Sequence, residues 1–291
     1  MPAAQLRHRH FSFDQSWEGT MAGVRELKVD IGGKKYRIAS DDDYLDHIRK
    51  GFEPEMVRLF RSVLRSGDTV LDVGANIGCT ALLFGETAAS VYAFEPSRTT
   101  FDFLSRNARA SGLPNIHPQN YGLGAQPGEF TLTFAPTNRS GGFVSNLTQA
   151  SAGHTVETIA IRQLDEVVPA LGLQRLDFIK IDVEGFEGEV LKGGRAVLQQ
   201  FKPTVVLELN HWCLNAFQRT SVPDFFDLLL SIFPVLYAVD RDRYLDLHDE
   251  SDRYTAMYHH ILEMRFPNLL GAFDQERVAR FRAAYRHGFK A

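Results

Sequence analysis

The middle of the chain alternates short apolar runs with segments of helical periodicity. Four of these runs have the composition of β-strands and lie at 69–74, 90–96, 176–182 and 204–210. Strands that alternate with helices form a mostly parallel sheet covered by helices on both faces. Alternating residues around Gly32-Gly33 predict an N-terminal β-hairpin, and residues 128–134 predict a second hairpin strand inserted between two βα units. We therefore expect a doubly wound α/β fold.

Composition excludes several other classes of protein. The 291 residues are 44% hydrophobic and 23% charged, which excludes disordered, collagen-like and coiled-coil chains. The net charge of −4 provides no basic footprint for nucleic acid. The longest apolar segment, 225–239, contains Asp227 and Pro234 and is too short to span a bilayer. Cys79 and Cys213 lie far apart and match no metal or redox spacing, which indicates a reducing compartment. We therefore expect a soluble, cytoplasmic protein with no nucleic-acid partner and no membrane span.

The segment VLDVGANIG has the pattern of a nucleotide-binding turn between a strand and a helix. Gly74 and Gly78 bracket the turn, and Glu95 closes the next strand, where a carboxylate can accept both hydroxyls of a ribose. A dinucleotide site has the spacing G-x-G-x-x-G, and the carboxylate of Asp72 would repel a pyrophosphate. The ammonium and sulfonium groups of S-adenosylmethionine suit that charge, so the pattern favours a methyltransferase. An ordinary βα turn with a surface acid is the structural alternative.

A second group of polar residues follows two later strands. Alternation places Lys180, Asp182 and Glu184 on one side of DFIKIDVEG, and His211 lies just past the end of the next strand. Ligands of open α/β sheets bind outside the carboxyl ends of the strands, so we expect these residues to meet the glycine turn there. The alternative is a buried ion pair of Lys180 with Asp182 or Glu208, with His211 exposed.

Five segments together resemble one family, the FkbM-type class I S-adenosylmethionine-dependent methyltransferases. They are VLDVGANIG, VYAFEPS, RNARASG, FIKIDVEGFEGEVLKGG and VVLELN, and the resemblance runs from about Glu53 to Asn210. KIDVEGFE with the downstream LKGG is the most specific part. The resemblance implies a Rossmann-like, seven-stranded sheet with the last strand antiparallel, and O-methylation of hydroxyls on sugars, glycans or secondary metabolites.

The same resemblance implies a set of residues that line the site of the S-adenosylmethionine cofactor, namely Glu53, Asp72, Gly74, Asn76, Gly78, Glu95 and Asn120. We interpret residues 1–50 as a tail and β-hairpin, 51–265 as the methyltransferase domain and 266–291 as a helical C-terminal extension. Residues 135–153 are rich in Ser, Gly, Asn and Thr, and we expect this loop to order or move when the acceptor binds.

Methyl transfer needs two aligned reactants and the removal of one proton. Asp182, Glu184 and His211 are the candidate general bases, and Lys180 would orient the acceptor or the acids. The clustered carboxylates leave a metal open, but no strict ligand spacing supports one, so we assign no metal ligands. Two other functions remain open at this point, which are a Rossmann-type NAD-dependent oxidoreductase and a catalytically inactive nucleotide-binding scaffold.

Overall fold

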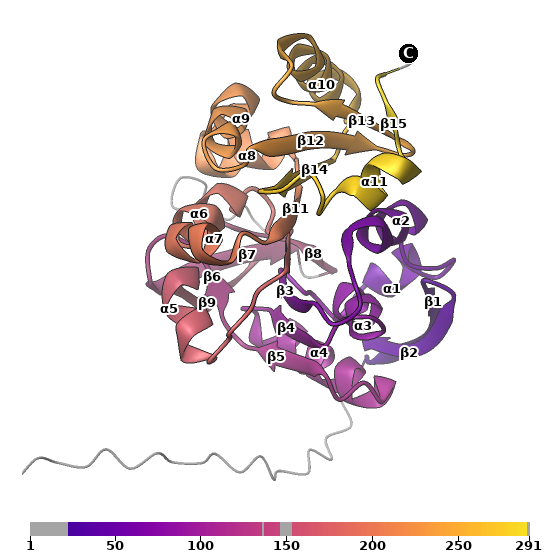
Figure 1. The fold of residues 1–291 in the computed structure, drawn as a ribbon. Helices are drawn as coiled ribbons and strands as arrows, with labels where there is room; N and C mark the ends of the chain where they lie inside the picture. Colours follow the sequence, from indigo (N-terminus) through magenta and orange to yellow (C-terminus); the bar gives the residue numbers. More distant parts are fainter. Residues whose placement is uncertain (1–22, 136, 146–152, 290–291) are drawn as a thin grey trace, which may run out of the picture.

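A nine-stranded mixed sheet forms the centre of the protein (Figure 1). The computed structural model describes residues 23–135, 137–145 and 153–289, so most of the predicted N-terminal tail lies outside the described residues. The strands follow the order β15-β13-β12-β14-β11-β10-β3-β4-β5. Their bounds are β3 Thr69–Val73, β4 Ser90–Phe94, β5 Ile116–Gln119, β10 Phe178–Ile181, β11 Thr204–Glu208, β12 Val235–Asp240, β13 Arg243–Asp246, β14 Asn268–Ala272 and β15 Arg286–His287.

The pairing of these strands confirms the doubly wound α/β fold and extends the predicted sheet. Strands β5, β4, β3, β10 and β11 are parallel, and β14 runs antiparallel between β11 and β12. These seven strands match the expected sheet with its antiparallel last strand. Strands β13 and β15 add two more at the edge beyond β12. Residues 266–291 therefore differ from the predicted helical extension, because β14 buries Leu269 and Leu270 inside the sheet.

Helices cover both faces of the sheet, and each face has its own apolar core. Alternation along β10 places Phe178 in one core and Ile179 and Ile181 in the other. The Phe178 face packs against α1 Tyr44–His47, α2 Pro54–Val63, α3 Cys79–Gly85, α4 Arg98–Ser111 and α11 Ala279–Ala284. The Ile179 face packs against α5 Leu164–Ala170, α6 Glu187–Lys192, α7 Arg195–Phe201, α8 His211–Gln218, α9 Val222–Leu230 and α10 Glu250–Glu263. Within the part of the chain that the structure describes, no helix is long and apolar enough to cross a bilayer.

Two smaller sheets flank the central one. The predicted N-terminal hairpin is present as β1 (Arg25–Ile31) and β2 (Lys34–Ser40), and the Asn107 side chain of α4 bonds to both backbone groups of Ala39. The predicted inserted hairpin is part of a four-stranded sheet in the order β6-β9-β7-β8. Its bounds are β6 Gly122–Leu123, β7 Gly128–Ala135, β8 Asn138–Val144 and β9 Thr155–Arg162.

The prediction of a loop at 135–153 is wrong for its first half, where the chain forms strand β8. Strand β8 pairs antiparallel with β7, and this pairing buries Phe143 and Val144 despite the Ser and Gly content of the segment. The alternating apolar residues of β7 provide the partner that the composition of β8 alone does not indicate. Residues 146–152 of the predicted loop lie outside the described residues.

Candidate active site

The glycine turn after β3 lies directly against the end of β10. Gly74 has a φ of +77°, and a Cβ on it would overlap the backbone carbonyl of Asp182. Gly78 has a φ of +101° and precedes α3, where a Cβ would lie 2.9 Å from Leu104 of α4. The two glycines therefore have different tasks. Gly74 brings the turn close to the polar residues of β10, whereas Gly78 allows α3 to pack on α4.

The carboxylate of Glu95 is held in a fixed position at the end of β4. One oxygen accepts the backbone N–H of Asn76 at 3.1 Å, and the other accepts that of Ser97 at 2.9 Å. Burial nevertheless raises the pKa of Glu95 to about 7. The Asn120 side chain donates to the backbone carbonyls of Glu95 and Pro96, each at 3.1 Å. Asn120 thus holds the backbone that carries Glu95. The sequence predicted that Asn120 would contact the cofactor directly.

Lys180 forms a buried ion pair with the acid of the glycine-loop strand. The parallel register puts Lys180 beside Asp72, and its ammonium lies 3.3 Å from the Asp72 carboxylate and 3.5 Å from that of Asp182. The ammonium also donates to the Gly74 carbonyl at 2.7 Å, and the Thr80 hydroxyl donates to Asp72 at 2.6 Å. Although burial opposes the charge, the two aspartates raise the pKa of Lys180 to about 12. Asp72 is completely buried beneath this network, in contrast to the predicted cofactor contact.

Two adjoining cavities open at the carboxyl ends of the parallel strands. The larger has a volume of about 680 Å³ and the smaller about 80 Å³. Both are lined by Gly74, Asn76, Ser140, Asp182 and Glu184. Of the other predicted site residues, the larger cavity takes Glu53 and Lys180, and the smaller takes Glu95. The predicted residues that are not among the described lining of either cavity are Asp72, Gly78, Asn120 and His211.

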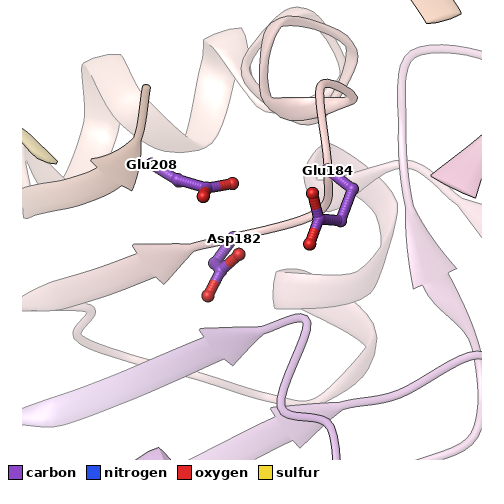
Figure 2. Close-up of side chains that lie close together, drawn as sticks. All are labelled: Asp182, Glu184 and Glu208. Carbon is purple, nitrogen blue, oxygen red and sulfur yellow. The ribbon is translucent and has the colours of Figure 1, made fainter. Parts of the chain in front are cut away.

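Three carboxylates converge in the larger cavity. Asp182 follows β10, Glu184 lies in the next turn, and Glu208 ends β11; one oxygen from each lies within 4.8 Å of the others (Figure 2). Burial and the neighbouring Asp182 raise the pKa of Glu184 to about 7 and that of Glu208 well above its usual range. Lys180 is the only Lys or Arg among the described residues that line this cavity, and Asp72 already engages it.

The turn that carries Glu184 is fixed by a residue outside the predicted site. The buried carboxylate of Glu187 accepts the backbone N–H groups of Val183 at 3.0 Å and Gly185 at 3.2 Å. Glu184 itself has a φ of +52°, a conformation that costs a non-glycine residue free energy and must be held by its surroundings. Sequence reasoning missed Glu187 as a site residue. Its position within KIDVEGFE, the most specific motif, was the available signal.

His211 lies next to this region but outside the cavities. It begins α8, where its backbone N–H donates to the ring of His260 at 3.2 Å and the two rings meet edge to face at 5.1 Å. Its predicted role as a general base therefore has no support from its position. Glu208, which the sequence suggested only as an ion-pair partner of Lys180, lies in the cavity instead.

Comparisons with known proteins agree with this arrangement of motifs. Residues 72–242 match the methyltransferase FkbM domain family. The hexuronic acid methyltransferase AglP of Haloferax volcanii is 34% identical over 155 residues, which cover 53% of this chain and 61% of that protein. The 31-O-demethyl-FK506 methyltransferase FkbM of Streptomyces tacrolimicus is 30% identical over 159 residues, which cover 45% of this chain and 60% of that protein. The chain thus spans about three fifths of the length of these relatives.

A solved structure with the same family name aligns with part of this chain. The methyltransferase FkbM of Methylobacillus flagellatus KT aligns with a TM-score of 0.42 and 20% identity, over 59% of this chain and 39% of its own. The family match at residues 72–242 includes the glycine turn, the end of β4 and the whole of KIDVEGFE. Since that match covers more than half of the 291 residues, the protein belongs to the FkbM methyltransferase family.

Proposed function

We propose that the protein transfers a methyl group from S-adenosylmethionine to a hydroxyl oxygen of a sugar, glycan or secondary metabolite. The observation that carries this proposal is the pair of cavities that adjoin at Gly74, Asn76 and Asp182, with a fixed carboxylate on one side and an acidic cluster on the other. Membership in the FkbM family supports the reaction class.

The residues of the two cavities suit the chemistry of this cofactor. Glu95 keeps free lone pairs that would accept the ribose hydroxyls, because each of its oxygens accepts only one backbone N–H. Phe94, Leu132, Phe134 and Phe186 surround the smaller cavity with apolar surface that suits an adenine ring. The excess of carboxylates in the larger cavity suits the ammonium group of the cofactor. When bound, the cofactor supplies an electrophilic methyl carbon.

The smaller cavity would have to open to admit an adenosine. Its volume of about 80 Å³ is well below the roughly 300 Å³ at which ligand pockets usually begin. Leu132 and Phe134 of β7 and Val144 of β8 cover it, so we expect the β7–β8 hairpin to move when cofactor binds. Hydrogen exchange within 128–144 should change on adding S-adenosylhomocysteine. Unchanged exchange at saturating ligand would contradict this movement.

Asp182 and Glu184 are the residues that we propose to receive the acceptor's proton. In the reaction the hydroxyl O–H proton passes to a carboxylate, the oxygen–methyl bond forms and the methyl–sulfur bond breaks. The products are a methyl ether and S-adenosylhomocysteine. Lys180 would act as a positioning residue, since its ammonium holds both Asp182 and the Gly74 carbonyl.

The charge of the larger cavity bears on the acceptor. Five of its lining residues are acidic, namely Glu53, Glu55, Asp182, Glu184 and Glu208. This charge favours a neutral hydroxyl compound over an anionic one. The Haloferax relative is named for a hexuronic acid, so neutral sugars and hexuronates form the first pair of acceptors to compare.

Calorimetry and mass spectrometry test the proposal in sequence. The full chain should bind S-adenosylmethionine and S-adenosylhomocysteine and should not bind NAD⁺. Incubation with methyl-labelled cofactor and a panel of sugars, hexuronates and hydroxylated metabolites should then yield one product heavier by a labelled methyl. Binding of NAD⁺ alone, or no binding of either sulfur compound at millimolar concentration, would refute the proposal.

A further inference from the structure

We propose that Asp182, Glu184 and Glu208 bind one hard divalent cation, Mg²⁺ or Mn²⁺, in the larger cavity. The three side chains come from neighbouring parallel strands and the turn that follows one of them, so the sheet itself brings them together (Figure 2). The sequence left a metal open and assigned no ligands, because these residues follow no fixed spacing along the chain.

The distances between the carboxylates fit a small cation with little adjustment. Their nearest oxygens lie within 4.8 Å of one another. Oxygen ligands at about 2.1 Å from Mg²⁺ in octahedral geometry lie about 3 to 4 Å apart, so small side-chain rotations would close the site. All three ligands are carboxylates, without a thiolate or imidazole, and this donor set selects hard cations over zinc or copper.

A second observation, independent of the clustering, points to a missing positive partner. The Oε2 atom of Glu208 is buried and accepts no hydrogen bond from any described residue. A buried carboxylate oxygen costs free energy unless it is hydrogen-bonded, paired with a cation or bound to a metal. Lys180 does not fill this role, because its ammonium contacts Asp72, Asp182 and the Gly74 carbonyl.

The ligands also differ in how firmly they are held. Two backbone hydrogen bonds to Glu187 fix the turn that carries Glu184, and the Cys213 thiol donates to the Glu184 carboxylate at 3.2 Å. Asp182 is more exposed, at 44% of its side chain, and can rotate toward a bound ion. Glu184 is thus an ordered ligand and Asp182 an adjustable one, which suits a cation that keeps open coordination positions for water or substrate.

The role of the cation rests on the proposed methyl transfer, although its binding does not. Three carboxylates would leave open positions that an acceptor oxygen can occupy, next to the residues shared with the smaller cavity. The cation would also offset the negative charge that opposes an anionic acceptor such as a hexuronate. A hexuronate should therefore bind more tightly with Mg²⁺ present than with a chelator.

Manganese binding to the full chain provides the test. After treatment with EDTA and its removal, electron paramagnetic resonance should show one Mn²⁺ per chain, with a dissociation constant below about 1 mM. Glu208→Gln and Glu184→Gln should each weaken binding at least tenfold. Glu55→Gln, a change at an exposed carboxylate of the same cavity, should leave the affinity within about twofold.

The same samples separate this inference from the proposed function. Circular dichroism establishes that each variant is folded, and the wild-type titration alone decides the proposal if a variant is not. No Mn²⁺ binding by the wild type, or an equal loss in Glu55→Gln, would overturn the cation site. Binding of S-adenosylhomocysteine in EDTA is measured in parallel. If the chain binds S-adenosylhomocysteine but not Mn²⁺, only the cation site fails. If it binds Mn²⁺ but not S-adenosylhomocysteine, only the cofactor assignment fails.

Discussion

Two groups of carboxylates border the same cavities and differ in how they are satisfied. At the ends of β3 and β4, Asp72 has Lys180 and Thr80 as partners, and Glu95 has two backbone N–H groups. At the ends of β10 and β11, three carboxylates converge and Glu208 retains a buried oxygen without a hydrogen bond. In the first group every carboxylate oxygen has a hydrogen bond or, for Oδ1 of Asp72, the Lys180 ammonium 3.3 Å away, whereas Oε2 of Glu208 has neither among the described residues.

This difference separates residues that build the site from residues that act in it. A buried carboxylate with all its partners maintains the geometry of the strands around it. A convergent group of acids in which one buried oxygen has no partner costs stability and is retained where binding or catalysis uses it. Removal of Lys180, the positive partner of Asp72, should therefore lower stability, whereas removal of the Glu208 carboxylate should raise it.

The largest effect should follow removal of the Lys180 ammonium, which is the positive partner of Asp72. Lys180→Met leaves Asp72 buried with no positive partner, so we expect the free energy of unfolding to fall by about 3–5 kcal/mol. Urea denaturation followed by circular dichroism measures the change. Lys192→Met is the matched control, because its ion pair with Glu189 is on the surface and should contribute no more than about 1 kcal/mol.

A double variant determines whether the loss comes from the uncompensated charge. Asp72→Asn combined with Lys180→Met should recover part of the lost stability, since the buried carboxylate is then neutral. Strictly additive losses would show that Lys180 contributes through packing alone, and the contrast between the two groups would then disappear.

A smaller effect should appear as a pH dependence at Glu95. Its pKa rises from 4.5 to about 7 on folding because of burial, so the folded protein binds more protons than the unfolded chain between these values. The contribution of Glu95 to stability therefore falls as pH rises from about 4.5 to 7, by on the order of 2–3 kcal/mol, and is constant outside that window.

Comparison with Glu95→Gln isolates this contribution. The stability of the wild type relative to the variant should decrease from pH 4.5 to 7 and then level off, while other titrating acids cancel in the difference. Glu129→Gln, at an exposed position on β7, should give a flat difference. A flat difference for Glu95→Gln as well would mean that the carboxylate is not desolvated in the folded protein. The variant should also bind S-adenosylhomocysteine about tenfold to a hundredfold more weakly.

The sequence predicted the fold well because periodicity along the chain determines which face of each element is buried. It identified the strands that hold Asp182 and Glu95 and the turn at Gly74. It did not predict β14 at the centre of the sheet, since Asn268–Ala272 is short and contains a glycine. Only pairing with β11 and β12 makes this segment a strand.

The roles of individual polar residues were harder to predict because they depend on register between distant strands. Lys180 lies beside Asp72 on the neighbouring parallel strand. Asp72, which the sequence placed in the cofactor site, therefore forms a buried ion pair with Lys180. His211 follows its strand as expected, but α8 begins at that residue and directs it toward His260. Alternation along a strand gives the face of a side chain and not its partner.

The smallest effect should come from Glu208, and it should raise the free energy of unfolding where Lys180→Met lowers it. Without divalent cations, Glu208→Gln should raise the free energy of unfolding by about 0.5–2 kcal/mol, because it removes a buried like charge and its amide can donate to Asp182 or Glu184. Mn²⁺ should reverse the order of the two proteins. At ten times its dissociation constant the ion would stabilise the wild type by about 1.4 kcal/mol, and the variant would gain little. Thermal unfolding in EDTA and in Mn²⁺ measures both differences, with Glu55→Gln as the control at an exposed carboxylate of the same cavity. If Glu208→Gln instead destabilises the protein in EDTA, Glu208 has a partner that completes it, and the two groups of carboxylates do not differ in the way their geometry indicates.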